Sequence, residues 1–330
     1  MRRMLLREAG DVEDARLVEE GGALPAPGAH EVALRVLACG VCHTDLHIVE
    51  GEVAAPLPRV LGHQVVATVQ SLGAEVDGVS VGDRVGVGWL ATTCGACEYC
   101  TSGRENLCEG ARFTGRDVDG GYAEEMLADA RFVHPLPRSF SDVEAAPLLC
   151  AGIIGYRALK LSEVRPGERL GLFGFGASAH LAIQVARSWG CEVYVFTRGE
   201  AHRRLARELG AVWTGGAEDD PGVALHAAVS FAPAGWIVPA ALARLGRGGT
   251  LAVNAVHASD IPSFPFERIY WERTVRSVAN FTREDAREFL ALAAEIGLRV
   301  EVEECPLRDA NEALVRLKRG EVQGAAVLLP

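Results

Sequence analysis

Residues 168–190, ERLGLFGFGASAHLAIQVARSWG, carry the clearest indication of how the second half of the chain folds. An apolar run leads into Gly174 and Gly176, and a segment with apolar residues at helical spacing follows and stops at Gly190. In a G-x-G-x-x-A turn the first glycine makes the bend, the second lets the backbone approach a pyrophosphate, and the small third residue, here Ala179, permits helix–strand packing. A helix N-terminus near Ala177 favours phosphate charge. The stretch therefore predicts a dinucleotide site that includes Gly174, Gly176 and Ala177.

Strands and helices alternate downstream of this turn. CEVYVFT (191–197) and TLAVNAV (250–256) have the composition of buried strands, and EAHRRLARELG (200–210) and WIVPAALARLGRGG (236–249) have helical patterns. This alternation predicts a doubly wound parallel sheet of the Rossmann type over residues 151–281. Residues 282–330 add two helices and two strands, which either extend this sheet or return to the first domain; we assign them to the first domain.

The first 150 residues have a different character. Short valine-rich runs broken by Gly, such as HEVALRVLACG (30–40) and GHQVVATVQSLG (62–73), predict β-strands with tight turns. We expect an irregular, barrel-like β domain over residues 1–150, so the whole chain is of the α/β class.

Composition limits the function. The chain has 330 residues, 49% of them hydrophobic, and a formal net charge of −11, which disfavours nucleic acid as a partner. No secretory leader and no apolar run of about 18 residues is visible, so we expect a cytoplasmic protein that does not bind membranes. In a reducing compartment the nine cysteines point to metal binding or catalysis rather than to disulfides.

Four cysteines lie within TTCGACEYCTSGRENLC, residues 92–108. Their spacing, C-x2-C-x2-C-x7-C, brings Cys94, Cys97, Cys100 and Cys108 within reach of one tetrahedral ion, and four thiolates leave no open position, so the zinc would be structural. Disulfides, a redox centre and a zinc ribbon that binds a macromolecule are the alternatives. The mixed charge around the cluster disfavours the ribbon.

Cys42, His63 and Cys150 form a second possible donor set, although they are far apart in the sequence. Each alone is ordinary, because a lone cysteine among apolar residues is usually a core residue. Two thiolates and one imidazole with an open fourth position are together the donor set of a catalytic zinc.

The ordered combination of GVCHTDLH (40–47), LGHQ (61–64), the cysteine-rich lobe, LLCAGIIGY (148–156) and GFGASAH (174–180) resembles the zinc-dependent alcohol dehydrogenases of the medium-chain dehydrogenase/reductase superfamily. The resemblance covers essentially the whole chain. It implies a GroES-like catalytic domain and a Rossmann domain, a catalytic zinc on Cys42, His63 and Cys150, and a structural zinc on the four lobe cysteines. Hydride transfer between a zinc-bound alkoxide and NAD(P) is the implied reaction.

The resemblance also implies roles for neighbouring residues. The proton would leave through the Thr44 hydroxyl and the nicotinamide ribose to His47. His43 would lie near the cofactor pyrophosphate, Asp45 would accept the ring N–H of His63, and Trp89 would form a wall of the substrate pocket.

Two positions depart from the family pattern. Gln64 follows the zinc histidine where many members have Glu, which removes a negative charge near the metal. Ala325 stands in the last strand where some members carry an arginine for the pyrophosphate.

The second strand of the nucleotide domain ends in Thr197 and Arg198 rather than in the acidic residue that binds the ribose of NAD. Arg198 can pair with a 2′-phosphate, which favours NADP. We therefore predict an enzyme with two Zn²⁺ per chain that acts with NAD(P) on a small alcohol or aldehyde as a homodimer or homotetramer. The alternatives are a polyol or aromatic-alcohol dehydrogenase of the same family, and a non-catalytic, zinc-stapled nucleotide-binding redox sensor.

Overall fold

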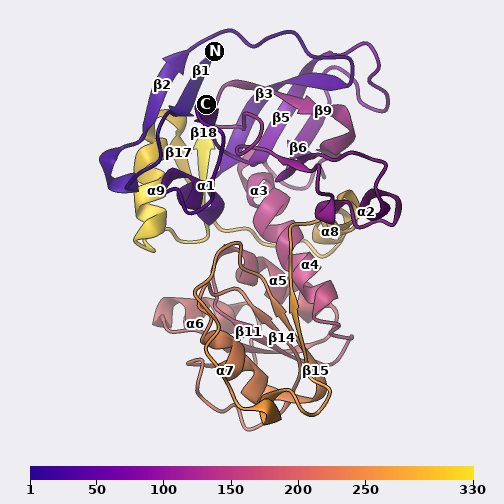
Figure 1. Cartoon of the computed structure of the whole chain (residues 1–330), viewed down its shortest axis with the longest axis vertical. Helices are drawn as coiled ribbons and strands as arrows, with labels where there is room; N and C mark the ends of the chain where they lie inside the picture. The colour runs from indigo at the N-terminus through magenta and orange to yellow at the C-terminus, as the bar shows by residue number, and fades with distance from the viewer. The chain divides into compact units, whose positions relative to one another are not determined.

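The computed structural model describes residues 1–330, which form two compact units (Figure 1). The first unit contains Met1–Cys150, Asn280–Ala294 and Val300–Pro330, and the second contains Ala151–Ala279 and Glu295–Arg299. The first unit is therefore built from both ends of the chain.

The second unit is a parallel six-stranded sheet in the order β13-β12-β11-β14-β15-β16. The strands are β11 (Arg169–Phe173), β12 (Glu192–Phe196), β13 (Trp213–Gly215), β14 (Leu225–Ser230), β15 (Leu245–Val253) and β16 (Thr274–Ser277). This is the 3-2-1-4-5-6 order of a dinucleotide-binding fold, and it confirms the predicted doubly wound sheet. The order reverses at β11, so the carboxyl end of β11 and the glycine turn lie at the switch point.

The helices of this unit are α4 (Ile153–Leu161), α5 (Ala177–Ser188), α6 (Glu200–Glu208) and α7 (Ile237–Arg244). The first turn of α5 packs closely on α4, because a Cβ added to Gly155 would lie 3.0 Å from the Ser178 carbonyl oxygen. α7 ends at Arg244, earlier than the pattern of residues 236–249 predicts. Leu245 is already extended and pairs with Leu225 of β14, and an irregularity in register follows between Leu225 and Ala227.

The first unit contains a seven-stranded sheet with the path β10-β6-β5-β3-β18-β17, on which β9 also pairs with β3. Its strands are β3 (Glu31–Gly40), β5 (Gln64–Leu72), β6 (Arg84–Val87), β9 (Glu125–Asp129), β10 (Val133–Pro135), β17 (Val302–Pro306) and β18 (Ala325–Leu329). β18, from the end of the chain, pairs antiparallel with β3 through Val327–Gly40 and Leu328–Cys39. The sheet is thus completed only by the last strand.

Two smaller sheets and several short helices complete this unit. One sheet has the order β2-β1-β4 (Leu17–Gly21, Arg2–Leu6, Arg59–Val60), and the other pairs β7 (Leu90–Thr92) with β8 (Arg112–Phe113). The helices are α1 (His43–Val49), α2 (Glu98–Thr101), α3 (Asp142–Pro147), α8 (Arg283–Glu295) and α9 (Ala310–Lys318). Valine and leucine side chains of β1, β3, β5 and β6 form the core between them. No helix in either unit has the length and apolarity needed to cross a membrane.

Candidate active site

The start of α1 concentrates functional side chains. Cys42 is the N-cap in extended conformation, and its N–H donates to Oδ2 of Asp45, the third helical residue, at 3.0 Å. An acidic side chain in the first turn suits the partial positive charge of a helix N-terminus. The cap therefore fixes Cys42 and Asp45 relative to each other.

Cys42, His63 and Cys150 converge although 108 residues separate the first from the last. One Sγ or ring nitrogen from each lies within 4.8 Å of the others. His63 precedes β5, and Cys150 lies in the π-helical turn Leu148–Gly152 that follows α3. π-helical turns often occur at functional sites, and this one brings the third donor to the group.

The orientation of His63 fits a metal. Its Nδ1 lies 3.3 Å from Oδ1 of Asp45, which leaves Nε2 on the side of the two thiols. Nε2 is buried and has no hydrogen-bond partner in the protein. Metal-binding histidines ligate through one ring nitrogen and donate the other N–H to a carboxylate or carbonyl. With two thiols beside it, this donor set fits zinc with one open position.

The group is electrostatically negative. A hydrogen bond from the Cys150 thiol and the charge of the nearby His63 ring lower the pKa of the Cys42 thiol well below its ordinary value. Burial lowers the pKa of His63, but the Asp45 carboxylate and Cys42 outweigh it and raise that pKa to about 10. A buried site that favours a thiolate and stabilises positive charge is suited to a divalent cation.

The other predicted residues of α1 surround Cys42. Thr44 is buried, and its Oγ1 lies 3.8 Å from Cys42 Sγ. His47, one turn further along, pairs through Nδ1 with Glu52, a partner that the sequence did not reveal. The ring centroid of His43, which is exposed, is 6.5 Å from that of His47. Thr44 and His47 are three residues apart in α1, so they share a face of the helix.

Trp89 and Gln64 also lie beside His63. The Trp89 ring meets the His63 ring edge-on at 4.8 Å and stacks on Phe113 at 5.1 Å. Gln64 begins β5 and is buried, and its Oε1 has no hydrogen-bond partner. Ala325, the other departure, is the buried first residue of β18.

The four lobe cysteines form a compact group in the loop that contains α2. The Sγ–Sγ distances are 3.5 Å for Cys97–Cys100, 3.5 Å for Cys94–Cys108 and 3.9 Å for Cys94–Cys100. A tetrahedral zinc with Zn–S bonds of about 2.3 Å has sulfur–sulfur edges of about 3.8 Å. The N–H groups of Ala96 and Cys97 lower the pKa of the Cys94 thiol to about 6, which favours the thiolate. All four cysteines are free of disulfides, and the geometry fits a closed metal site.

The nucleotide turn follows β11. Gly174 has a φ of +89°, and a Cβ there would lie 3.2 Å from the Ala232 nitrogen, so the bend requires glycine. Gly176 is the N-cap of α5, and a Cβ built on it would meet no atom within 4 Å. Ala177 begins the twelve-residue α5. A phosphate can therefore reach the first backbone N–H groups of α5.

The end of β12 carries positive charge. Thr197 is buried, and its N–H donates to the Gly215 carbonyl at 2.7 Å. The exposed Arg198 follows, and Nε of Arg203, on α6, donates to the Thr197 carbonyl at 2.9 Å. Arg203 lies at the same strand end as Arg198, and the predicted set did not include it.

The fold and the two donor groups define a zinc-binding dehydrogenase, and comparisons with known proteins agree. A family model described as an alcohol dehydrogenase GroES-like domain matches residues 28–138, and one described as a zinc-binding dehydrogenase matches residues 179–295. A probable alcohol dehydrogenase AdhA from Mycobacterium tuberculosis is 47% identical, with 98% of this chain and 96% of the relative covered. An alcohol dehydrogenase from Geobacillus stearothermophilus is 38% identical, with 90% and 91% covered.

Solved structures give the same result. An alcohol dehydrogenase from the hyperthermophilic archaeon Aeropyrum pernix superposes with a TM-score of 0.88 at 32% identity, with 100% of both chains covered. A cinnamyl alcohol dehydrogenase from Sorghum bicolor has a TM-score of 0.89 at 28% identity, with 99% of this chain and 96% of that chain covered. The chain belongs to the zinc-dependent alcohol dehydrogenases of the medium-chain dehydrogenase/reductase superfamily. It is an oxidoreductase of the zinc- and nicotinamide-dependent type.

Proposed function

We propose that Cys42, His63 and Cys150 hold the catalytic zinc and that the lobe cysteines hold a structural zinc, which makes two Zn²⁺ per chain. The convergence of the three donors within 4.8 Å, with the unpartnered Nε2 of His63 among them, carries this proposal. The catalytic domain comprises residues 1–150 and 282–330, and the nucleotide-binding domain comprises residues 151–281.

Zinc held by these three residues would act as a Lewis acid that lowers the pKa of an alcohol. The protein must then move a proton out of a buried place. The Thr44 hydroxyl, which lies beside Cys42, would accept the alcohol proton as it gives its own to the nicotinamide ribose, and His47 would then take the proton from the ribose. Glu52 orients the His47 ring through Nδ1. Trp89, packed between His63 and Phe113, bounds the substrate pocket and favours slender substrates.

The cofactor binds at Gly174, Gly176 and Ala177, with His43 near its pyrophosphate. We propose a preference for NADP over NAD, because Arg198 and Arg203 stand at the end of β12 where a carboxylate would repel the 2′-phosphate. Kinetics with both cofactors test this preference. Arg198→Asp should lower kcat/KM for NADP more than for NAD, and an equal effect on both would contradict it.

Metal analysis separates the enzyme from a zinc-stapled redox sensor. We expect two zincs per chain in the native protein and one in Cys42→Ser, which should retain its fold and lose turnover. Cys97→Ser is the matched variant in the lobe: it should also lose one zinc, but its main effect should be lower thermal stability. Full activity in Cys42→Ser, or a single zinc in the native protein, would contradict the catalytic assignment.

The substrate is a small alcohol or aldehyde. A panel of primary, secondary, polyol and aromatic alcohols discriminates the candidates within the family. The aromatic Trp89–Phe113 wall and the fold shared with the sorghum cinnamyl alcohol dehydrogenase favour including aromatic alcohols in that panel.

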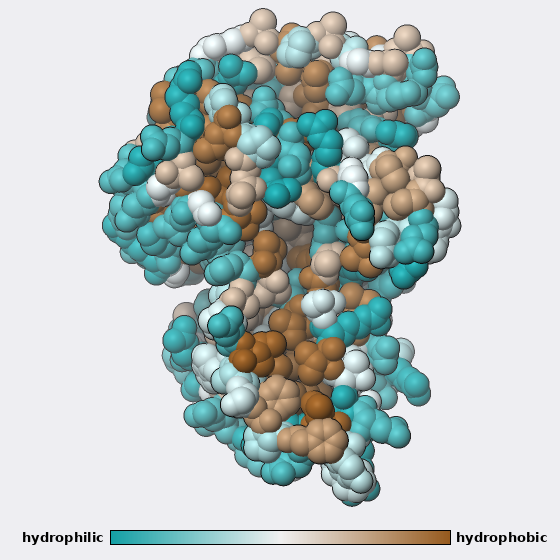
Figure 2. Space-filling view, in the orientation of Figure 1, coloured by the Kyte–Doolittle hydropathy of each residue, from teal (hydrophilic) through white to brown (hydrophobic).

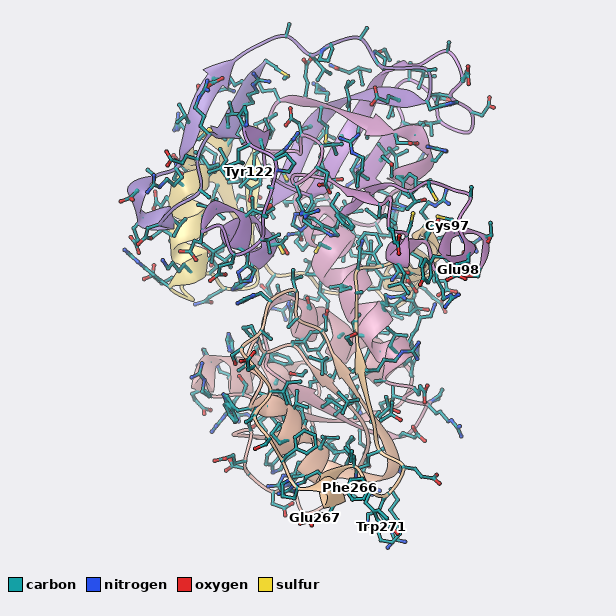
Figure 3. All side chains as sticks on the ribbon, viewed as in Figure 1. Cys97, Glu98, Tyr122, Phe266, Glu267 and Trp271 are labelled. Atoms are coloured by element: carbon teal, nitrogen blue, oxygen red, sulfur yellow. The ribbon has the colours of Figure 1, made fainter.

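The edge of the nucleotide-domain sheet supports assembly into a homodimer or a homotetramer. All four residues of β16 are exposed, and large apolar side chains surround this edge. They are Phe266, Tyr270, Trp271 and Val275, which are 40–69% exposed. Figure 2 shows an apolar region on this unit, and Figure 3 labels Phe266 and Trp271. An open apolar edge strand promotes self-association unless a partner covers it. Val275→Lys should therefore produce monomers in light scattering.

The nine free cysteines support a cytoplasmic location.

A further inference from the structure

Asp45 is a completely buried carboxylate that two pairs of donors hold in place. Oδ2 accepts the Cys42 N–H at 3.0 Å and the Tyr122 hydroxyl at 3.2 Å. Oδ1 accepts the Gly62 N–H at 3.1 Å and faces Nδ1 of His63 at 3.3 Å. A buried carboxylate needs such donors to remain charged and fixed. Of these four donors, Cys42 and His63 belong to the proposed metal site, and Gly62 adjoins His63. Only the Tyr122 hydroxyl comes from a residue that is distant in sequence from all three metal donors.

Tyr122 is itself fixed to the segment that leads into His63. Its N–H donates to the Leu61 carbonyl at 2.9 Å, and the Gly121 N–H donates to the Gly62 carbonyl at 2.9 Å. Its ring covers Gly62, because a Cβ there would lie 2.3 Å from Cδ1 of Tyr122. Tyr122 is fully buried, and Figure 3 labels it within the first unit. Backbone, ring and hydroxyl therefore all act on groups next to His63.

We propose that Tyr122 is a positioning residue for the catalytic metal site: its hydroxyl fixes the Asp45 carboxylate, which in turn orients His63 so that Nε2 faces the two thiols. The inference rests on the proposed zinc site. A phenylalanine would fill the same core volume, so the hydroxyl serves the carboxylate rather than the packing. Partners of this kind, one step beyond the metal donors, commonly change metal affinity by 10–100-fold.

The test compares Tyr122→Phe with the native protein loaded with metal at both sites. Tyr122→Phe should release one of its two zincs to a chelator about tenfold more readily, as expected for the loss of one donor to a charged acceptor. With Co²⁺ in the catalytic site, the visible d–d bands should shift, and kcat should fall more than KM rises.

Tyr194→Phe is the matched control, because Tyr194 is also buried and its hydroxyl donates to a carboxylate, that of Glu192, at 3.4 Å in the other unit. It should leave zinc release and the Co²⁺ spectrum unchanged. A purely structural role for Tyr122 would lower the melting temperature and leave both metal readouts at native values, and that result would overturn the proposal.

Asp45→Asn provides an independent test. If Tyr122 acts through Asp45, adding Tyr122→Phe to Asp45→Asn should change zinc release by less than twofold, and full additivity would overturn the proposal. Should Tyr122→Phe not fold, native zinc affinity in Asp45→Asn alone would also overturn it. A native protein that holds only the lobe zinc would instead refute the proposed function, so the two failures are distinguishable.

Discussion

Arg283→Met and Glu105→Gln break the same ion pair, but the structure predicts unequal losses of stability. Glu105 belongs to the cysteine lobe and accepts four hydrogen bonds from Arg283 at the start of α8: the backbone N–H at 2.8 Å, Nη2 at 2.6 Å, and Nε to both oxygens at 3.0 Å. The Arg283 side chain is 44% exposed, whereas that of Glu105 is only 8% exposed. The carboxylate is therefore the partner that cannot return to water.

The magnitudes follow from this asymmetry. Glu105→Gln leaves a guanidinium that water still reaches, so the loss is that of charge-assisted hydrogen bonds, about 2 kcal/mol. Arg283→Met leaves a buried carboxylate without its counter-ion, which should cost about 3–4 kcal/mol. The double variant carries neither charge and should be more stable than Arg283→Met alone. For a domain of this size each kcal/mol corresponds to about 2–4 °C in melting temperature.

Acidification should expose the same asymmetry. Burial raises the pKa of Glu105, but Arg283 outweighs it and lowers that pKa below its ordinary value of 4.5. The contribution of the pair is thus complete above pH 4.5 and is lost as the pH falls through the lower, folded pKa. In Arg283→Met the buried Glu105 carboxyl lacks its counter-ion and takes up a proton more readily. The difference in stability between Arg283→Met and the double variant should therefore become smaller as the pH approaches 5.

Thermal unfolding of the zinc-loaded variants and hydrogen exchange of α8 amides measure these differences. Arg287→Met is the control on the same helix, because the side chains of Arg287 and its partner Glu284 are 76% and 52% exposed. Its melting temperature should stay close to that of the native protein, because exposed ion pairs contribute little to stability. Equal losses in Glu105→Gln and Arg283→Met would refute the argument from burial.

Three further predictions concern single positions. Gly62 and Gly82 have nearly the same φ, +92° and +93°, but only a Cβ added at Gly62 would meet another atom, Cδ1 of Tyr122 at 2.3 Å. Gly62→Ala should therefore cost about 2–3 kcal/mol more stability than Gly82→Ala, measured by thermal unfolding. Similar losses in the two variants would show that the core around Tyr122 adjusts to the added methyl group. Burial lowers the pKa of His134 to about 4 in the folded protein. Between pH 6.5 and 5 this histidine therefore gains a proton only in the unfolded chain, which should lower the free energy of unfolding by about 2 kcal/mol at pH 5. His134→Gln removes this loss, and its melting temperature relative to the native protein should rise on acidification; a constant difference would contradict the shift. Trp89→Ala opens the wall beside His63 and should raise kcat/KM for branched alcohols relative to ethanol, whereas an unchanged ratio would place the substrate elsewhere.

The local parts of the fold could be predicted from the sequence. The glycine turn at Gly174 and Gly176, the strand before it and the helix after it are determined by neighbouring residues, and the structure contains all three. The lobe cysteines are also close in sequence, and their sulfurs lie together as the spacing indicates. The helical pattern of residues 236–249 continues past Arg244, but α7 ends there because Leu245 pairs with Leu225 of β14.

The remaining features depend on contacts between distant segments. No local pattern shows that Tyr122 reaches Asp45 across 77 positions, or that Arg283 reaches Glu105 across 178. The signal for Tyr122 was a tyrosine after two glycines, which is equally typical of a turn. Cys42, His63 and Cys150 could be grouped by their donor chemistry, but their assignment to one zinc came from the family resemblance, because no local pattern places such distant residues together.

The position of β18 beside β3 determines when the protein can assemble during synthesis. The strands of the nucleotide-binding sheet, β11–β16, emerge consecutively from the ribosome, so this sheet can form while translation continues. The larger sheet of the other unit is completed only when residues 325–329 pair with the end of β3, nearly three hundred positions earlier in the chain. Nascent chains should therefore acquire a nucleotide-binding fold before the catalytic half is complete, with the carboxyl end of β3, which pairs with β18, open to chaperones in the interval.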